Sequence, residues 1–225
     1  VSNNHTIQIQ GDWSNQSGSI FTAGTGTVNF TSPVATLTTT ITSRDTTDNT
    51  FHNVIISGPG IVQPNDDIKI TGNFTIYSGS TFNLTNKFMS LYGNFSNDGG
   101  TFSYGSSTVQ FNGNTTQTIT NSSGDLNFYN LNINNGTNVH CSQIGSSSNG
   151  IIINNNLNLN AGNLRSHIGS DYRYVRVIGN ITRSGGGYVD GELRKLIPAG
   201  SSSTLFEVGH MFAYTPIRLE ITGTG

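Results

Sequence analysis

The sequence predicts an all-β protein, built as a right-handed parallel β-helix (a β-solenoid) with a small C-terminal β module. Short runs alternate apolar with polar residues, Asn, Gly and Ser separate these runs, and the same pattern recurs along the chain. Alternation with a period of two is typical of a strand that has one buried and one wet face. Its recurrence indicates a stacked architecture in which neighbouring repeats share one core.

The clearest alternation lies between residues 107 and 138. Its apolar positions are Val109, Phe111, Ile119, Phe128, Leu131 and Ile133. A similar series upstream contains Val28, Phe30, Leu37, Ile41, Phe51, Val54 and Ile56. This self-similarity predicts two internal repeats of about 80 residues, each holding several solenoid turns of roughly 20 to 25 residues.

Shorter units support the repeat. Segments that open at Gly11, Gly93 and Gly179 each have a glycine, a polar residue and then an apolar residue. Residues 67–83 also align with residues 150–166. In the Asn-rich run 154–160 we expect Leu157 and Leu159 to point inward and the asparagines outward, where stacked amides can form ladders between turns. The polar face of an antiparallel sheet is the alternative reading of this run.

The composition and the apolar pattern change near the C-terminus. We therefore expect the β-helix over residues 1–187 and a β cap, or the start of a following β domain, over 188–225. Residues 165–225 hold seven of the ten basic and five of the twelve acidic residues. The apolar clusters at 193–197, 204–208 and 216–221 resemble longer paired strands. A stacked core needs such a cover because a bare end exposes strand edges and apolar surface.

Composition narrows the class of protein. Charged residues make up 10% of the chain and the net charge is −2, which argues against nucleic acid as a partner. No run approaches the 18 apolar residues of a membrane span, which predicts that none is present. Because the chain begins at Val1 and ends in Gly-Thr-Gly after a strand-like run, we expect a mature product or a piece of a longer polypeptide.

The single cysteine, Cys141, excludes an internal disulfide framework. We expect it to be a small buried residue on a strand. His140 precedes it and therefore points to the opposite face, so the two do not form a nucleophile–base pair.

The phrases around residues 26–58, 107–136 and 205–221 resemble repeat regions of very long secreted surface proteins, such as Bacteroidetes adhesins and some archaeal surface proteins. The resemblance covers nearly the whole chain. It implies a β-solenoid segment followed by a small β module, an extracellular location, and a non-enzymatic role as stalk, adhesin or filament. It implies no catalytic residues.

Several groups of residues are candidates for metal binding or catalysis, and for each group a purely structural interpretation is simpler. Asp66 and Asp67 in one turn, and Asp45 and Asp48 in another, are carboxylate pairs, but calcium needs six to eight oxygens and solvated turns are favoured. Arg173, Arg176 and Asp171 form the nearest approach to a lyase-type cluster. The five histidines, His210 included, lack metal-ligand spacing.

Two larger sets concern glycans. An aromatic strip for stacking on sugars would use Trp13, Tyr77, Tyr92, Tyr104, Tyr172 and Tyr174, although aromatic residues at strand spacing more often pack in the core. Ten sequons are candidate N-glycosylation sites, only slightly more than chance gives: Asn4, Asn15, Asn29, Asn73, Asn83, Asn94, Asn114, Asn121, Asn135 and Asn180.

Together these observations predict a non-enzymatic structural module of an extracellular or cell-surface protein, forming a stiff stalk or a self-assembling filament or sheath. Its expected partners are other copies of the chain or neighbouring domains of a longer polypeptide. The alternatives are an adhesin that binds cell-surface glycans and a β-helix carbohydrate-active enzyme. No cofactor and no metal ion are expected.

Overall fold

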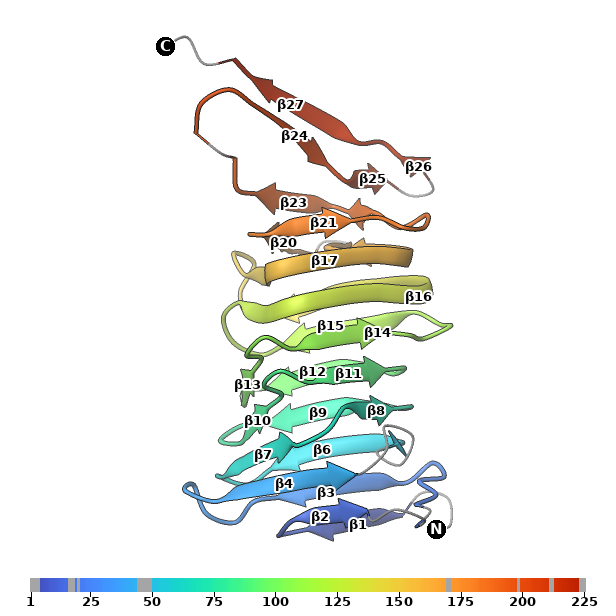
Figure 1. Ribbon diagram of the computed structural model, residues 1–225, viewed down its shortest axis with the longest axis vertical. Helices are drawn as coiled ribbons and strands as arrows, with labels where there is room; N and C mark the ends of the chain where they lie inside the picture. Colours follow the sequence, from blue (N-terminus) through green and yellow to red (C-terminus); the bar gives the residue numbers. More distant parts are fainter. Residues whose placement is uncertain are drawn as a thin grey trace.

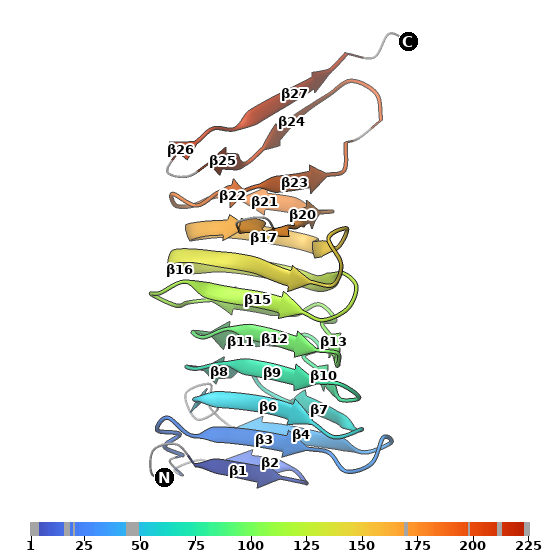
Figure 2. The same cartoon turned by 180° about the vertical axis from the view of Figure 1, so that it is seen from behind.

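The computed structural model describes residues 5–15, 19, 21–43, 50–168, 171–197, 199–210 and 213–222. These residues form strands and contain no helix, and the strands stack as a parallel β-solenoid of about nine turns (Figures 1 and 2). The predicted all-β β-solenoid fold is therefore confirmed. No helix among the described residues could cross a membrane.

The strands fall into three columns of parallel pairs. The first column contains β1 (Thr6–Ile9), β3 (Thr27–Thr31), β6 (Asn53–Ser57), β9 (Phe74–Tyr77), β12 (Phe95–Asp98), β15 (Gln117–Asn121), the later parts of the long strands β16 (Leu126–Ile144) and β17 (Gly150–Arg165), β22 (Val189–Asp190) and β25 (Val208–His210). The second contains β5 (Thr50–Phe51), β8 (Ile68–Ile70), β11 (Phe88–Leu91), β14 (Thr108–Phe111), the middle of β16 and β17, and β21 (Asn180–Thr182).

The third column has two separate parts. β2 (Trp13–Asn15), β4 (Thr38–Ser43), β7 (Ile61–Pro64), β10 (Thr81–Asn83) and β13 (Thr101–Ser103) form a sheet of their own, in which β13 is the last strand. The first residues of β16 and β17 then pair with each other, and β20 (Tyr174–Val177) and β23 (Glu192–Lys195) continue that stack. No ladder joins β13 to β16, so the column is interrupted between them.

The alternating apolar residues fill the interior, as the sequence predicts. Phe30, Phe51, Phe74, Phe95 and Phe128 are fully buried and lie on successive turns. The rings of Phe74 and Phe95 are in tilted contact with centroids 5.4 Å apart, and those of Phe95 and Phe128 are in edge contact with centroids 5.8 Å apart. The core is a continuous column of aromatic and β-branched side chains that each turn extends.

Turn length also agrees with the sequence analysis. Hydrogen-bonded asparagines on neighbouring turns are 20 residues apart at Asn53 and Asn73 and 26 residues apart at Asn132 and Asn158. The larger repeat of about 80 residues and the boundary at residues 187/188 stay predictions.

The predicted arrangement of residues 154–160 is confirmed. Leu157 and Leu159 are fully buried, and the asparagines point outward into side-chain ladders. Asn158 donates to Asn132, and Asn155 donates to Asn130 at 2.8 Å. These pairs supply hydrogen bonds to the side-chain amides on a face that carries little charge.

A second asparagine series lies at one corner of the solenoid. The side-chain oxygen of each asparagine accepts a hydrogen bond from a backbone N–H on the next turn, at 2.8 to 2.9 Å. Asn53 accepts from Asn73, Asn73 from Asn94, and Asn94 from Thr118. The turns approach closely here, because a Cβ at Gly93 would lie 2.3 Å from the Gly72 carbonyl oxygen. Glycine is therefore required immediately before Asn94.

The C-terminal part changes from parallel to antiparallel pairing. β22, β23 and β25 still pair parallel with the solenoid, whereas β24 (Ser202–Phe206) and β27 (Ile217–Ile221) form an antiparallel hairpin. β26 (Ala213–Tyr214) pairs antiparallel with β25, and β18 (His167–Ile168) with β19 (Asp171–Tyr172) forms a small lateral hairpin. The β24–β27 hairpin lies inclined above β23 at the C-terminal end (Figure 1).

Candidate functional sites

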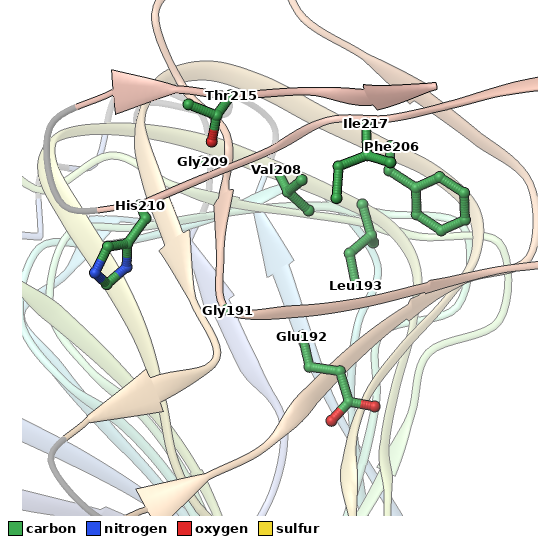
Figure 3. A pocket seen from close by; sticks show the side chains of 9 residues that line it. All are labelled: Gly191, Glu192, Leu193, Phe206, Val208, Gly209, His210, Thr215 and Ile217. Atoms are coloured by element: carbon green, nitrogen blue, oxygen red, sulfur yellow. The ribbon is translucent and has the colours of Figure 1, made fainter. Parts of the chain in front are cut away.

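A groove separates the β24–β27 hairpin from the last solenoid turn. It has a volume of about 450 Å³ and is lined by Gly191, Glu192, Leu193, Phe206, Val208, Gly209, His210, Thr215 and Ile217. Leu193 points from β23 toward Ile217 and Phe206 on the hairpin (Figure 3). The groove is open, and its walls are mainly apolar at the centre.

The hairpin itself exposes apolar surface. Ile217, Leu219 and Ile221 are 61%, 41% and 38% exposed, and they alternate along β27 so that they share one face. In the described residues the hairpin is a sheet of two strands, so each strand has one edge without a ladder partner. Apolar side chains beside a free strand edge are typical of a surface that pairs with another chain.

Charged side chains attach this hairpin to the solenoid. Lys195 on β23 donates to the Leu205 carbonyl oxygen at 2.7 Å and lies 3.2 Å from a Glu207 carboxylate oxygen. Both charged side chains are largely buried, at 14% and 11% exposure. Removing one partner of a buried ion pair is costly, so Lys195 and Glu207 help to hold the hairpin against β23.

A second, polar pocket lies at the interruption of the third column. Its volume is about 210 Å³, and it is lined by Asn97, Gly100, Thr101, Phe102, Tyr104, Asn121, Ser123, Asp125, Leu126 and Asn127. We refer to it as the polar pocket. It combines amides, hydroxyls and one carboxylate with the rings of Phe102 and Tyr104.

Asp125 is the only charged residue of the polar pocket. Burial raises the pKa of its carboxyl, but hydrogen bonds from Gly150 N–H, the Tyr174 hydroxyl and Asn149, together with the Arg194 charge, outweigh burial and hold the pKa below its ordinary value. Burial and this same bond to Asp125 raise the pKa of Tyr174. The pocket is therefore anionic at neutral pH.

The environment of Cys141 agrees with the sequence prediction. Cys141 is fully buried on β16 and is a free thiol. Burial raises the pKa of this thiol well above its ordinary value, so it is not a thiolate at neutral pH. His140 lies on the opposite face of the strand, next to Arg165 on the neighbouring strand. His140 and Cys141 therefore form no catalytic pair.

The Asp66–Asp67 turn is built to cap backbone groups. Asp66 accepts a hydrogen bond from Ser43 N–H on the preceding turn, and Asp67 accepts one from Phe88 N–H on the following turn, both at 2.8 Å. Asp45 and Asp48 lie outside the described residues. Within the described part of the chain, no cluster of three or more His, Cys, Asp or Glu side chains forms a metal site.

The arginine cluster near residue 173 is not an open catalytic groove. Arg173 is buried and donates to the Ser146 carbonyl oxygen at 2.9 Å, whereas Arg176 is exposed on β20. The Asp171 side chain lies outside the described residues. His210 lies 3.4 Å from the buried Asp190 carboxylate, which also pairs with Arg165 at 2.9 Å.

The six aromatic residues do not form one strip. Trp13 packs against Phe21 and Phe51 near the N-terminal end, and Tyr174 is buried with the Arg194 guanidinium 3.7 Å from its ring centre. Tyr77 and Tyr92 are exposed, Tyr104 lines the polar pocket, and the Tyr172 side chain is outside the described residues. The strip hypothesis is therefore wrong for Trp13 and Tyr174, because these two rings complete packing.

The sequons occupy very different environments. Asn15, Asn121 and Asn135 are buried, and the Asn135 amide nitrogen donates to Thr115 and Gln117, which leaves no room for a glycan in the folded chain. Asn29 and Asn83 are half-buried and hydrogen-bonded, and Asn4 lies outside the described residues. Exposed sequons are Asn73, Asn94, Asn114 and Asn180.

The polar pocket was not predicted from the sequence. Among its lining residues only Asn121, as a sequon, and Tyr104, as a candidate for stacking on sugars, were singled out. Only the stacking of turns brings them together.

No protein-family model, curated protein or solved structure matches the chain. The fold and these sites therefore carry the functional argument alone.

Proposed function

We propose that the chain is a non-enzymatic structural module of an extracellular or cell-surface protein, a stiff rod that stacks end to end with other copies of itself. About nine turns with a rise of about 4.8 Å each make a rod of roughly 40 Å. The observation that carries the proposal is the concentration of exposed apolar side chains at the C-terminal end: Leu196, Ile217, Leu219 and Ile221.

The proposed occupant of this end is the first turn of a second copy. Among the described residues β1 pairs on one side only, with β3, so its other edge can continue a ladder. Residues 1–164 carry three basic and seven acidic residues, whereas residues 165–225 carry seven basic and five acidic residues. Stacking head to tail thus brings together opposite net charges as well as strand edges.

A pair of matched variants tests the proposal. Leu219→Asp places a charge on the apolar face of the hairpin, and Tyr77→Asp places one at a similarly exposed position (45% against 41%) on the side of the rod. We expect electron microscopy and sedimentation of the wild type and Tyr77→Asp to show end-to-end oligomers or filaments. Leu219→Asp should be monomeric.

Monomeric wild-type rods at high concentration would contradict the proposal. Loss of assembly in both variants would also contradict it, because the side of the rod would then be the interface.

A further inference from the structure

The polar pocket interrupts an otherwise apolar inward-facing row. Ile56, Ile76, Asn97, Asn121 and Ile144 lie at equivalent inward positions on successive turns of the first column. Isoleucine is used on both sides of the two asparagines, so the fold does not require an amide at these positions. Buried amides cost free energy unless hydrogen-bonded, so an amide pair that the fold does not need suggests a second role.

The orientation of the amide pair leaves one oxygen without a partner. The Asn121 side-chain N–H₂ donates to the carbonyl oxygens of Ser123 and Gly124, which can only accept. Asn121 Oδ1 therefore faces Asn97 and accepts its N–H₂ at 2.8 Å. Asn97 is only 6% exposed, and its Oδ1 is buried without a hydrogen bond. A buried oxygen without a hydrogen bond destabilises the fold unless a donor reaches it.

The pocket offers further hydrogen-bonding groups at the same place. Among the residues that the structure describes, β13 pairs only with β10, so the backbone edge of Thr101–Ser103 that faces the pocket has no ladder partner there. The Asp125 carboxylate also lines the pocket, and its Oδ2 receives no hydrogen bond from the described residues. The site needs a ligand that donates several hydrogen bonds.

Size and charge restrict the ligand further. The volume of about 210 Å³ is smaller than the 300–1,000 Å³ of pockets for drug-sized molecules, and no Lys or Arg is among the lining residues. An anionic ligand would meet the Asp125 carboxylate and would find no Lys or Arg among the lining residues to bind it. The rings of Phe102 and Tyr104 supply apolar surface beside the polar groups.

From these observations we infer that the polar pocket binds one ring of a neutral glycan. Sugar hydroxyls donate to the Asn97 and Asp125 oxygens and to carbonyl oxygens on the open edge of β13, and they accept from N–H groups on the same edge. The apolar face of the ring lies against Phe102 or Tyr104. A calcium ion fits less well, because it needs six to eight oxygens and the pocket contains one carboxylate.

Binding is best measured by NMR on the purified chain. Neutral methyl glycosides of glucose, galactose and mannose are titrated at millimolar concentration, with a uronic acid and calcium chloride as separate arms. We expect a neutral glycoside to shift the side-chain amide signals of Asn97 and Asn121 and the backbone amide signals of residues 101, 102 and 104, which line the pocket and still report binding in a variant that lacks both asparagines. The uronic acid and calcium should leave those signals in place.

Two variants and a control make the test specific. The double variant Asn97→Ile/Asn121→Ile extends the apolar row and should fold, while weakening binding at least tenfold. Tyr104→Ala should also weaken it without altering the interior. Asn114→Ala, an exposed asparagine outside the pocket, should bind as the wild type does.

The inference is overturned if no neutral glycoside shifts these signals, if the variants bind unchanged, or if calcium alone produces the shifts. It does not rest on end-to-end stacking, because the pocket lies on the side of the rod. Assembly of the double variant, measured by sedimentation, therefore reports separately on the proposed function.

Discussion

His140 and Cys141 are neighbours on one strand that face opposite sides. Cys141 lies in the apolar core, whereas His140 lies on the outer face with its Nε2 buried and without a hydrogen bond. Burial and the adjacent Arg165 lower the pKa of His140, and Asp190 only partly opposes them. The folded chain therefore holds this histidine neutral.

A pH dependence of stability follows from His140. Below its ordinary pKa of 6.5 the unfolded chain binds a proton that the folded chain does not, so the free energy of unfolding falls as the pH decreases from about 6.5 toward the lowered folded value. We expect His140→Gln to reduce this loss. Urea denaturation at pH 7.5 and pH 5.5 measures the free energy of unfolding at each pH. If the variant loses as much stability between the two pH values as the wild type does, His140 is not the group responsible.

Phe95 packs among three other aromatic rings in the core. It contacts Phe74, Phe102 and Phe128 and is fully buried. Phe95→Ala leaves a cavity between rigid turns that cannot collapse onto it, so the free energy of unfolding should decrease by about 3–5 kcal/mol. Denaturant unfolding checks this value. Tyr92→Ala, at an exposed position, is the control and should change stability much less.

Residue-level prediction from the sequence succeeded where alternation dictated the answer. Phe111, Ile133 and Leu157 are buried because a strand with a period of two places every second side chain inside. The polar pocket was not predictable in this way. Asn97 and Asn121 follow the same alternation as the isoleucines, and only the registers of three consecutive turns show that the two amides are adjacent.

At the level of elements, the hairpin β24–β27 is the part least integrated into the stack. Its link to β23 depends on Lys195, which contacts Leu205 and Glu207. Lys195→Met keeps the length of the side chain but removes the charge, which leaves the Glu207 carboxylate without its cation. We expect amide hydrogen exchange in β24 and β27 to become about tenfold faster, with the central turns unchanged.

Arg218→Ala is the matched control for this experiment. Arg218 is an exposed cation on the hairpin itself and contacts Ser203 rather than the solenoid. It should leave exchange in the hairpin nearly unchanged. Equal acceleration in both variants would mean that Lys195 does not attach the hairpin to β23.

The paired strands of the C-terminal part were predicted in part. The runs 204–208 and 216–221 do supply the two strands of the antiparallel hairpin, whereas the run 193–197 supplies β23, which pairs parallel with β20. Apolar clustering marks a strand, but it carries no information about the direction of its partner.

For the molecule as a whole, the fold was predictable because one local pattern is repeated. Each turn forms its backbone hydrogen bonds with the neighbouring turns and buries its apolar side chains against them. The same alternation therefore suffices along the whole rod. The two ends and the interruption of the third column depart from the repeat, and both proposed sites lie at these departures. A repeated pattern predicts what is regular and leaves its exceptions to the three-dimensional structure.

The corner asparagines form hydrogen bonds in which the acceptor and the donor follow a fixed order along the chain. Asn53 presents its oxygen to the N–H of Asn73, Asn73 to that of Asn94, and Asn94 to that of Thr118. In each case the acceptor precedes its donor in the chain. At this corner a polypeptide emerging from the ribosome therefore already carries the acceptor for each of these three turns when the donor of that turn is translated.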